Sequence, residues 1–375
     1  MKKIAFLLVI ITLLGGCSNE YDINERTVVQ GIGIDILEDG KLLVTVQTLN
    51  KDSYSGIGGT KVPEKLAENY VLEGENVSDA LKNLPLLSGK LPLYTHTRII
   101  VISLEAAKKG IDGILDYFVR DPSCYAGVFV CVCSGKAEDI FNEFTDKESV
   151  PSAEIENAVG SIDFSPYLVS VKLYEAVKNI NEKTTCAVLP VIETVKEPGE
   201  KTKRIRVSKT AVFERDKLKS FITDDQTFYL NLFNNNIRQG TFILKTEDEN
   251  AGFRFYSSEC NTELINNGNK NLRFKTEIKI VLDTVEIDSP LSFTHDKAKI
   301  KDLESKAEKS IKDGLTSFLY KMSADGTDCM RIGRIVLHSD YEKYSLLEKN
   351  FSEMLKNAEY NVKVDVTIRS TGQRI

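Results

Sequence analysis

The sequence predicts an α+β protein of more than one domain, in which mixed or antiparallel sheets are covered by helices. Three observations support this fold class. The chain has 375 residues, which is more than one compact domain usually holds. Segments with the two-residue period of strands and segments with the helical period both occur, but they do not alternate regularly. Apolar residues of 300–322 recur at helical spacing in a charged segment, which predicts a long amphipathic helix in the C-terminal domain.

The first sixteen residues have the three parts of a signal peptide. Lys2 and Lys3 form a short positive end, and the run 4–14 is apolar except for one threonine. This run is shorter than the roughly 20 residues that a spanning helix needs, so it fits a cleaved signal. The ending LLGGC resembles the lipobox of bacterial lipoproteins. This resemblance implies a signal peptide over 1–16 and lipid attachment at Cys17. The alternative is an ordinary secretory signal that contains a cysteine.

Residues 17–25 are predicted to form a polar, lipidated tether after cleavage. Cleavage removes two lysines and no acids, so the formal net charge changes from −6 to −8. A mildly acidic body is not attracted to nucleic acid or to anionic lipid. We therefore expect no nucleic-acid partner, and we expect the covalent lipid to provide the membrane anchor. Two or more acyl chains give stable attachment, whereas one is marginal.

Residues 26–195 are predicted to form an N-terminal α+β region. Asp39-Gly40 lies between two apolar runs and predicts a tight hairpin turn. The stretch 145–152 is polar and predicts a division into two subdomains. Strands are expected at 28–36, 42–49, 66–73, 98–103, 125–133 and 186–195. Helices are expected at 76–84, 106–120 with a break near Gly110, 136–144, 153–160 and 169–180.

Residues 196–204 contain Pro, Gly and mixed charges without apolar periodicity, so they are predicted to be a linker. Residues 205–375 then form a C-terminal α+β domain. Strict alternation over 272–282 predicts a long strand with one buried face. The helix over 300–322 and another over 341–355 are expected to cover the sheet, and 362–368 forms a closing strand.

No arrangement of residues predicts catalysis. The three histidines, His96, His295 and His338, lie in no metal-binding spacing, and neither a nucleophile elbow nor a P-loop occurs. Gly31-Ile32-Gly33 begins like a dinucleotide fingerprint but lacks its third glycine and its helix. The acidic pairs at 224–225 and 248–249 are expected in solvated turns. We therefore predict no enzyme activity, no cofactor and no metal.

Six cysteines remain besides Cys17, and three interpretations are open. Several lie in apolar, strand-like stretches, which is typical of small buried hydrophobic residues. An exported protein can also form a disulfide, and a Cys-x-Cys pair can bind metal. Cys131 and Cys133 point the same way from one strand, which is a poor geometry for bonding each other. Free buried thiols are the favoured interpretation.

Read as a whole, the chain resembles the Ger(x)C family, the lipoprotein C-subunits of spore nutrient-germinant receptors. The resemblance lies in the order of segments along nearly the whole chain. It departs from the family pattern in having no tryptophan, whereas the family usually carries one just after the lipid cysteine and others near the end. The segments that carry it are VVQGIGIDI, LLVTVQTLN, THTRIIVISLEAAKKGIDGILDYFVRDPSCYAGVFVCVCSGKAEDIF, AVLPVIE, SKTAVFERDKLKSFIT, DCMRIGR and NVKVDVTIRSTG.

The resemblance implies a subunit without catalysis of its own, needed for germination in response to nutrients. It implies assembly with two multi-spanning subunits, A and B, on the outer face of the spore inner membrane. It assigns no ligand site, so Cys17 is the site residue carried over and no direct small-molecule ligand is expected. Arg120-Asp121-Pro122 is a candidate docking segment. The alternative there is a helix stop with an internal salt bridge.

A second functional hypothesis is an extracytoplasmic solute-binding lipoprotein of a transporter. That class needs two lobes with a hinge and a cleft between them. The long strands predicted after the linker count against it. A surface hydrolase is a third class, but the sequence offers it no pair of nucleophile and base.

Overall fold

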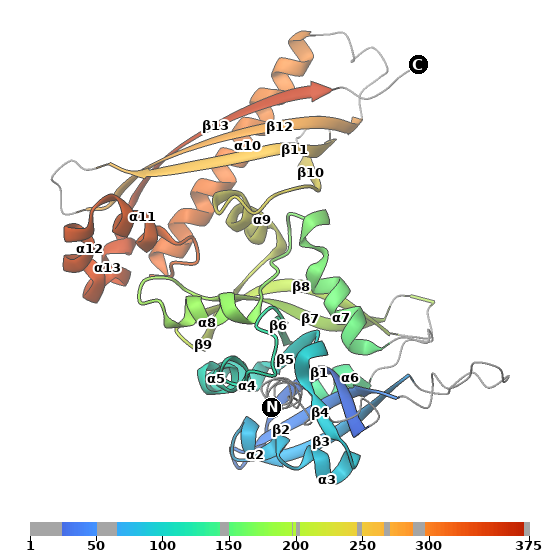
Figure 1. Cartoon of the computed structure of the whole chain (residues 1–375). Helices are drawn as coiled ribbons and strands as arrows, with labels where there is room; N and C mark the ends of the chain where they lie inside the picture. Colours follow the sequence, from blue (N-terminus) through green and yellow to red (C-terminus); the bar gives the residue numbers. More distant parts are fainter. Residues whose placement is uncertain are drawn as a thin grey trace, which may run out of the picture.

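The computed structural model describes most of the chain as one elongated molecule with a sheet in each half (Figure 1). The predicted signal peptide 1–16, Cys17 and nearly all of the tether 17–25 lie outside the described residues. The described ranges are 25–50, 66–142, 150–196, 198–199, 203–245, 250–265, 271–287 and 297–370.

The larger sheet occupies the N-terminal half and is mixed. Its order is β3-β2-β1-β5-β6-β7-β8-β9, and the short β4 pairs with the start of β1. The central strands β1, β5, β6 and β7 are parallel to one another, whereas the pairs toward both ends of the sheet are antiparallel. The bounds are β1 Arg26–Ile36, β2 Leu42–Leu49, β3 Ala67–Gly74, β4 Leu91–Leu93, β5 Ile99–Ser103, β6 Phe129–Cys133, β7 Val188–Lys196, β8 Lys203–Glu214 and β9 Lys217–Ile222.

Helices cover both faces of this sheet, so its central strands are buried on both sides. Ile100 and Val130 pack in one apolar cluster, and their neighbours Ile99 and Cys131 pack in another. This explains why β5 and β6 are apolar at nearly every position. The first cluster is covered by α2 Val77–Leu81, α4 Leu104–Lys109, α5 Asp112–Arg120 and α8 Leu173–Asn181, and the second by α6 Ala137–Asn142 and α7 Pro151–Gly160.

One helix boundary differs from the prediction, and another is confirmed. Pro85 directly follows the predicted helix 76–84, and it lies in the first turn of a second helix, α3 Leu84–Ser88, where its missing N–H costs nothing. The predicted break near Gly110 is confirmed, because Gly110 has φ +133° and separates α4 from α5. Short 3-10 helices complete this half at η3 Tyr94–His96 and η4 Ser161–Phe164.

The predicted linker, 196–204, lies between two strands that pair with each other. Lys196 of β7 pairs with Lys203 of β8 in an antiparallel hairpin. The larger sheet therefore continues to Ile222 and includes residues that the sequence analysis assigns to the C-terminal domain. A hairpin turn with Pro, Gly and mixed charge has the same composition as a linker. The predicted subdomain split near 145–152 lies mostly outside the described residues.

The Gly31-Ile32-Gly33 segment has a packing role in β1. A Cβ atom added at Gly31 would lie 2.6 Å from Phe141 Cε1 and 2.7 Å from Ser152 Cβ. Its missing side chain lets α6 and α7 approach the strand directly. The resemblance to a dinucleotide fingerprint is thus explained by close helix–strand packing.

We expect Gly31→Ala to lower the free energy of unfolding by about 1–3 kcal/mol, because the extra methyl overpacks a closed contact. Urea unfolding of purified protein measures the change. Gly135→Ala is the matched control, since nothing lies within 4 Å of a Cβ built there. Equal stability of the two variants would contradict this packing role.

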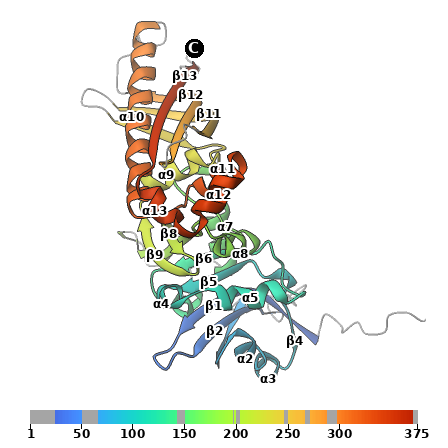
Figure 2. The ribbon, with the colours of Figure 1, turned by 90° about the vertical axis from the view of Figure 1, so that its left-hand side faces the viewer.

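The C-terminal half holds a four-stranded sheet with the order β10-β11-β12-β13. The last pair, β12 and β13, is parallel, and the other pairs are antiparallel. The long helix α10 crosses one face of this sheet (Figure 2), as the sequence predicts. Charged side chains of β12 and β13 are exposed on the other face. The strands are β10 Thr241–Lys245, β11 Asn250–Leu264, β12 Arg273–Ile287 and β13 Glu359–Ser370. The helices are α9 Asp224–Phe233, α10 Lys297–Ala324, α11 Ile332–Ser339, α12 Tyr341–Leu347, η6 Glu348–Asn350 and α13 Phe351–Lys356.

Side chains bind unpaired backbone groups of β13 and of the part of β11 that β10 does not reach. The backbone amides of Val366 and Ile368 in β13 donate to Glu308 and Glu304 of α10, at 3.0 and 2.8 Å. On the opposite edge, the Asn235 side chain pairs with both the amide and the carbonyl of Cys260, at 2.7 Å each. These contacts use backbone groups that would otherwise attract another strand.

Candidate functional site

The two halves of the molecule meet at the segment DCMRIGR, residues 328–334. The carboxylate of Asp328 is 2% exposed and accepts hydrogen bonds from the amides of Ile332 and Gly333, at 2.8 and 2.7 Å. It therefore caps the N-terminus of α11. Burial raises the pKa of Asp328 to about 7 and outweighs these two amide hydrogen bonds, which act in the opposite direction.

Arg334 joins α11 to the end of α8 in the N-terminal half. Its Nε atom donates to both carboxylate oxygens of Glu182 at 2.8 Å, and its Nη2 atom donates to Asn179 at 3.0 Å. Burial favours a higher pKa for Glu182, but the hydrogen bonds and charge of Arg334 lower the pKa overall. The pair is a partly buried, two-pronged link between residues 152 positions apart.

The backbone of the same segment is also held against the N-terminal half. The amide of Cys186 donates to the carbonyl of Asp328 at 2.9 Å. A Cβ atom at Gly333 would lie 2.3 Å from Thr184 Oγ1, so only glycine fits this approach. Residues 328–334 and 179–186 thus form one packed junction.

Helix α9 adds a second set of contacts across the junction. The buried Asn231 amide donates to the carbonyls of Pro166 and Leu168, at 2.9 and 2.6 Å. Its Oδ1 atom has no hydrogen-bond partner among the described residues. Asn234 donates to the carbonyl of Cys329 at 3.4 Å.

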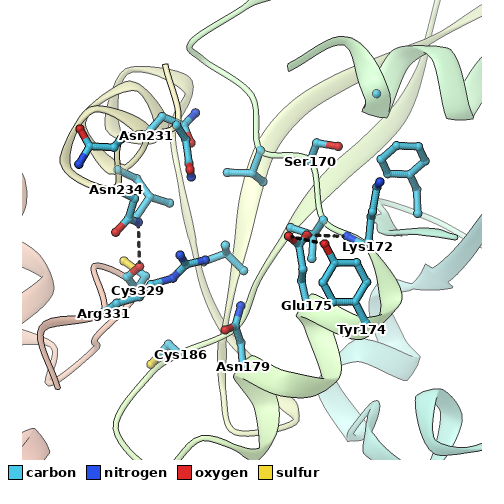
Figure 3. Close-up of a pocket in the computed structure, with 18 of the residues that line it drawn as sticks. Ser170, Lys172, Tyr174, Glu175, Asn179, Cys186, Asn231, Asn234, Cys329 and Arg331 are labelled. Atoms are coloured by element: carbon cyan, nitrogen blue, oxygen red, sulfur yellow. Dashed lines mark hydrogen bonds between the residues drawn. The ribbon is translucent and has the colours of Figure 1, made fainter. Parts of the chain in front are cut away.

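A polar cavity of about 470 Å³ lies beside the junction. Figure 3 shows Asn231, Asn234, Cys329 and Arg331 on one side, with Lys172, Tyr174 and Glu175 on the other. Arg331 has a left-handed backbone with φ +60°, and burial lowers the pKa of its guanidinium. Lys172 and Glu175 are linked at the start of α8, where Glu175 accepts from the Lys172 amide at 3.1 Å.

The cavity's two thiols are not activated as nucleophiles. Burial raises the pKa of Cys186 to about 12 and that of Cys329 well above its usual value. A protonated, buried thiol is a poor nucleophile. The cavity therefore offers polar contacts and no activated thiol.

The six cysteines of the described chain are free thiols. Cys131 and Cys133 are fully buried in the cluster beneath α6 and α7, and burial raises both pKa values, that of Cys133 to about 12. Within the described ranges, no group of three or more His, Cys, Asp or Glu side chains is placed to hold a metal ion. Nor does any helix there combine the length and the apolar character that crossing a bilayer requires.

The structure places the other sequence candidates apart from the junction. Arg120 pairs with Asp116 at 2.6 Å, and Asp121 accepts from the amide and the hydroxyl of Ser123. These contacts match the helix stop with an internal salt bridge, so we do not propose docking there. His96 is exposed on η3. Cys17, His295 and the pair at 248–249 lie outside the described residues.

The acidic pair at 224–225 is exposed, as predicted, but it begins helix α9 and does not lie in a turn. Thr223 and Gln226 form a capping box around it. That Thr-x-x-Gln spacing before an apolar run was the local signal that could have found the helix. Burial also raises the pKa of Asp224. The junction contacts of Arg334 and of the Asp328 carbonyl were missed because their partners, Glu182 and Cys186, lie far away in sequence.

Comparison with known proteins places both halves in one family. Residues 19–194 match the family described as "Spore germination protein N-terminal domain", and 208–372 match "Spore germination B3/ GerAC like, C-terminal". Spore germination protein KC of Bacillus subtilis (strain 168) is 23% identical, with 98% of this chain and 95% of that protein covered. GerQC of Bacillus cereus is 21% identical, with 99% of each chain covered. The crystal structure of the GerBC protein covers 90% of this chain and 97% of its own, with a TM-score of 0.60 at 15% identity.

Proposed function

The chain belongs to the Ger(x)C family of spore germination proteins, and from this premise we propose that it is a non-enzymatic lipoprotein subunit of a nutrient-germinant receptor. One observation supports this role above the others: relatives of this kind match the chain over nearly its whole length, from the tether to the last strand. A full-length match argues for the whole protein's role and not for one reused domain.

We further propose that lipid on Cys17 holds the protein on the outer face of the spore inner membrane, beside multi-spanning A- and B-type subunits. The packed junction supports a rigid body that presents surfaces, because Arg334 binds Glu182 and the carbonyl of Asp328 accepts from the amide of Cys186 across it. The high thiol pKa values at the cavity support a role without covalent chemistry.

Spores that lack this chain are expected to lose their response to at least one amino acid or sugar. The measurement is the fall in optical density of spore suspensions after each nutrient is added, with a strain that re-expresses the chain as the control. Wild-type rates for every nutrient tested would contradict the proposal.

Solute binding for a transporter is the second candidate, and the polar cavity is the observation that favours it. That function needs lobes that open and close, whereas the two-pronged Arg334–Glu182 pair and the Thr184–Gly333 contact oppose a hinge there. Titration calorimetry of the chain without residues 1–17 separates the two functions. Binding of a nutrient below millimolar concentration would favour the transporter role.

A further inference from the structure

An apolar patch lies at the end of the molecule opposite the C-terminal sheet. It consists of Leu86, Leu87 and Leu91, which are 81%, 60% and 37% exposed. Single exposed leucines are common, but two consecutive leucines on one helical turn with a third beside them form a patch. Figures 1 and 2 both show α3 at this end of the molecule.

The helical turn that carries the patch is fixed in place by its other residues. Leu84 of α3 is fully buried in the core beneath the sheet. Gly89 ends the helix with φ +65°, and its amide donates to the carbonyl of Pro85 at 2.9 Å. The core therefore anchors one side of α3 and leaves Leu86 and Leu87 pointing outward.

The chain's route from its proposed anchor leads to the same place. Leu91 pairs with Arg26 in the ladder between β4 and β1, so the patch lies beside the first residue of the first strand. Nine residue steps separate Cys17 from Arg26, and an extended chain spans at most about 3.3–3.6 Å per residue. The patch is thus held within roughly 30 Å of any bilayer that contains the Cys17 lipid.

A lysine lies within the patch. Lys90 is exposed between Leu87 and Leu91. Leucines with a lysine beside them are the composition of interfacial segments that insert apolar side chains below lipid headgroups.

We propose that Leu86, Leu87 and Leu91 insert into the lipid surface to which Cys17 is tethered. The proposal rests on the lipid anchor of the proposed function. It orients the molecule with α3 at the bilayer and the C-terminal sheet away from it. The occupant of the patch is phospholipid; a protein occupant or a second copy of this chain is the alternative that the test must distinguish.

The absence of tryptophan in this sequence makes a direct test simple. Leu87→Trp introduces one fluorophore at the patch, and Tyr256→Trp introduces one on the exposed face of β11, where Tyr256 is 58% exposed. Each full-length variant is purified with its native lipid and reconstituted into vesicles of phosphatidylcholine and phosphatidylglycerol. Half of the preparations contain brominated acyl chains, which quench tryptophan in the bilayer.

The Leu87→Trp variant is expected to shift its emission to the blue and to lose most of it to brominated lipid, whereas the Tyr256→Trp variant keeps its emission. Leu86→Trp gives a second position if the first variant folds poorly. Flotation of the vesicles tests the lipid anchor separately from the insertion of the patch. Failure to float contradicts the lipid anchor. Flotation with unquenched emission at both patch positions overturns membrane insertion and assigns the patch to a protein, and equal quenching at 256 overturns the orientation.

Discussion

Replacing Asp328 by alanine is expected to lower the free energy of unfolding by about 2–4 kcal/mol. The change removes the N-terminal cap of α11 and leaves two buried amide donors without a hydrogen-bond acceptor. It also removes the free-energy cost of burying the carboxyl group, which offsets part of the loss. For a cooperative unit of this size, the melting temperature falls by roughly 5–10 °C. Thermal unfolding followed by circular dichroism measures it.

Asp325→Ala is the matched control for this prediction. Asp325 lies three positions earlier and is exposed, and its backbone carbonyl, which the substitution retains, accepts a hydrogen bond from Lys219. Surface substitutions of this kind change stability by less than about 0.5 kcal/mol. If the two variants melt together, Asp328 does not hold the junction in the way described.

Replacing Cys17 by alanine is expected to release the protein from the membrane and to abolish its part in germination. Each buried acyl methylene contributes about 0.8 kcal/mol to membrane attachment, so losing the acyl chains removes nearly all of it. The acidic body does not restore attachment by charge. Immunoblots of membrane and soluble fractions from spores measure the first effect, and nutrient response measures the second.

Cys124→Ala serves as the control for that substitution, because it removes a half-buried thiol from the folded body without touching the N-terminus. It is expected to remain in the membrane fraction with a normal nutrient response. Membrane retention and normal germination of the Cys17→Ala spores would refute lipid anchoring at this residue.

Local sequence patterns predicted individual elements of this fold well. The alternation over 272–282 identified β12 and its buried face, and the helical spacing over 300–322 identified α10. Both patterns follow from which side chains an element must bury, so they can be read within a short window. The hairpin of β1 and β2 and its Asp-Gly turn were visible for the same reason.

Pairings between distant segments could not be read in this way. Nothing near β13 indicates that it lies parallel to β12, more than 80 residues earlier in register. Asp328 and Asp35 both cap helices. Asp328 caps the helix that follows it directly, whereas Asp35 caps α6, which lies 102 residues later in the sequence. Both carboxylates stand in apolar or mixed surroundings where local rules treat acids as surface residues. The junction was therefore visible only after folding placed 179–186 against 328–334.

The linker prediction shows a limit of predictions that rest on local composition. Residues 196–204 have the composition of an exposed connection, and β7 and β8 do turn there. Composition alone does not distinguish a turn that returns to the same sheet from one that leads to another domain. The deciding information is the pairing of the strands on either side, which depends on the whole sheet.

Mass spectrometry of the N-terminal peptide from the protein purified out of spore membranes tests the central claim most directly. The account predicts a mature chain that begins at Cys17 and carries diacylglycerol on its sulfur. A peptide that begins elsewhere, or an unmodified Cys17 on a freely released chain, would contradict it.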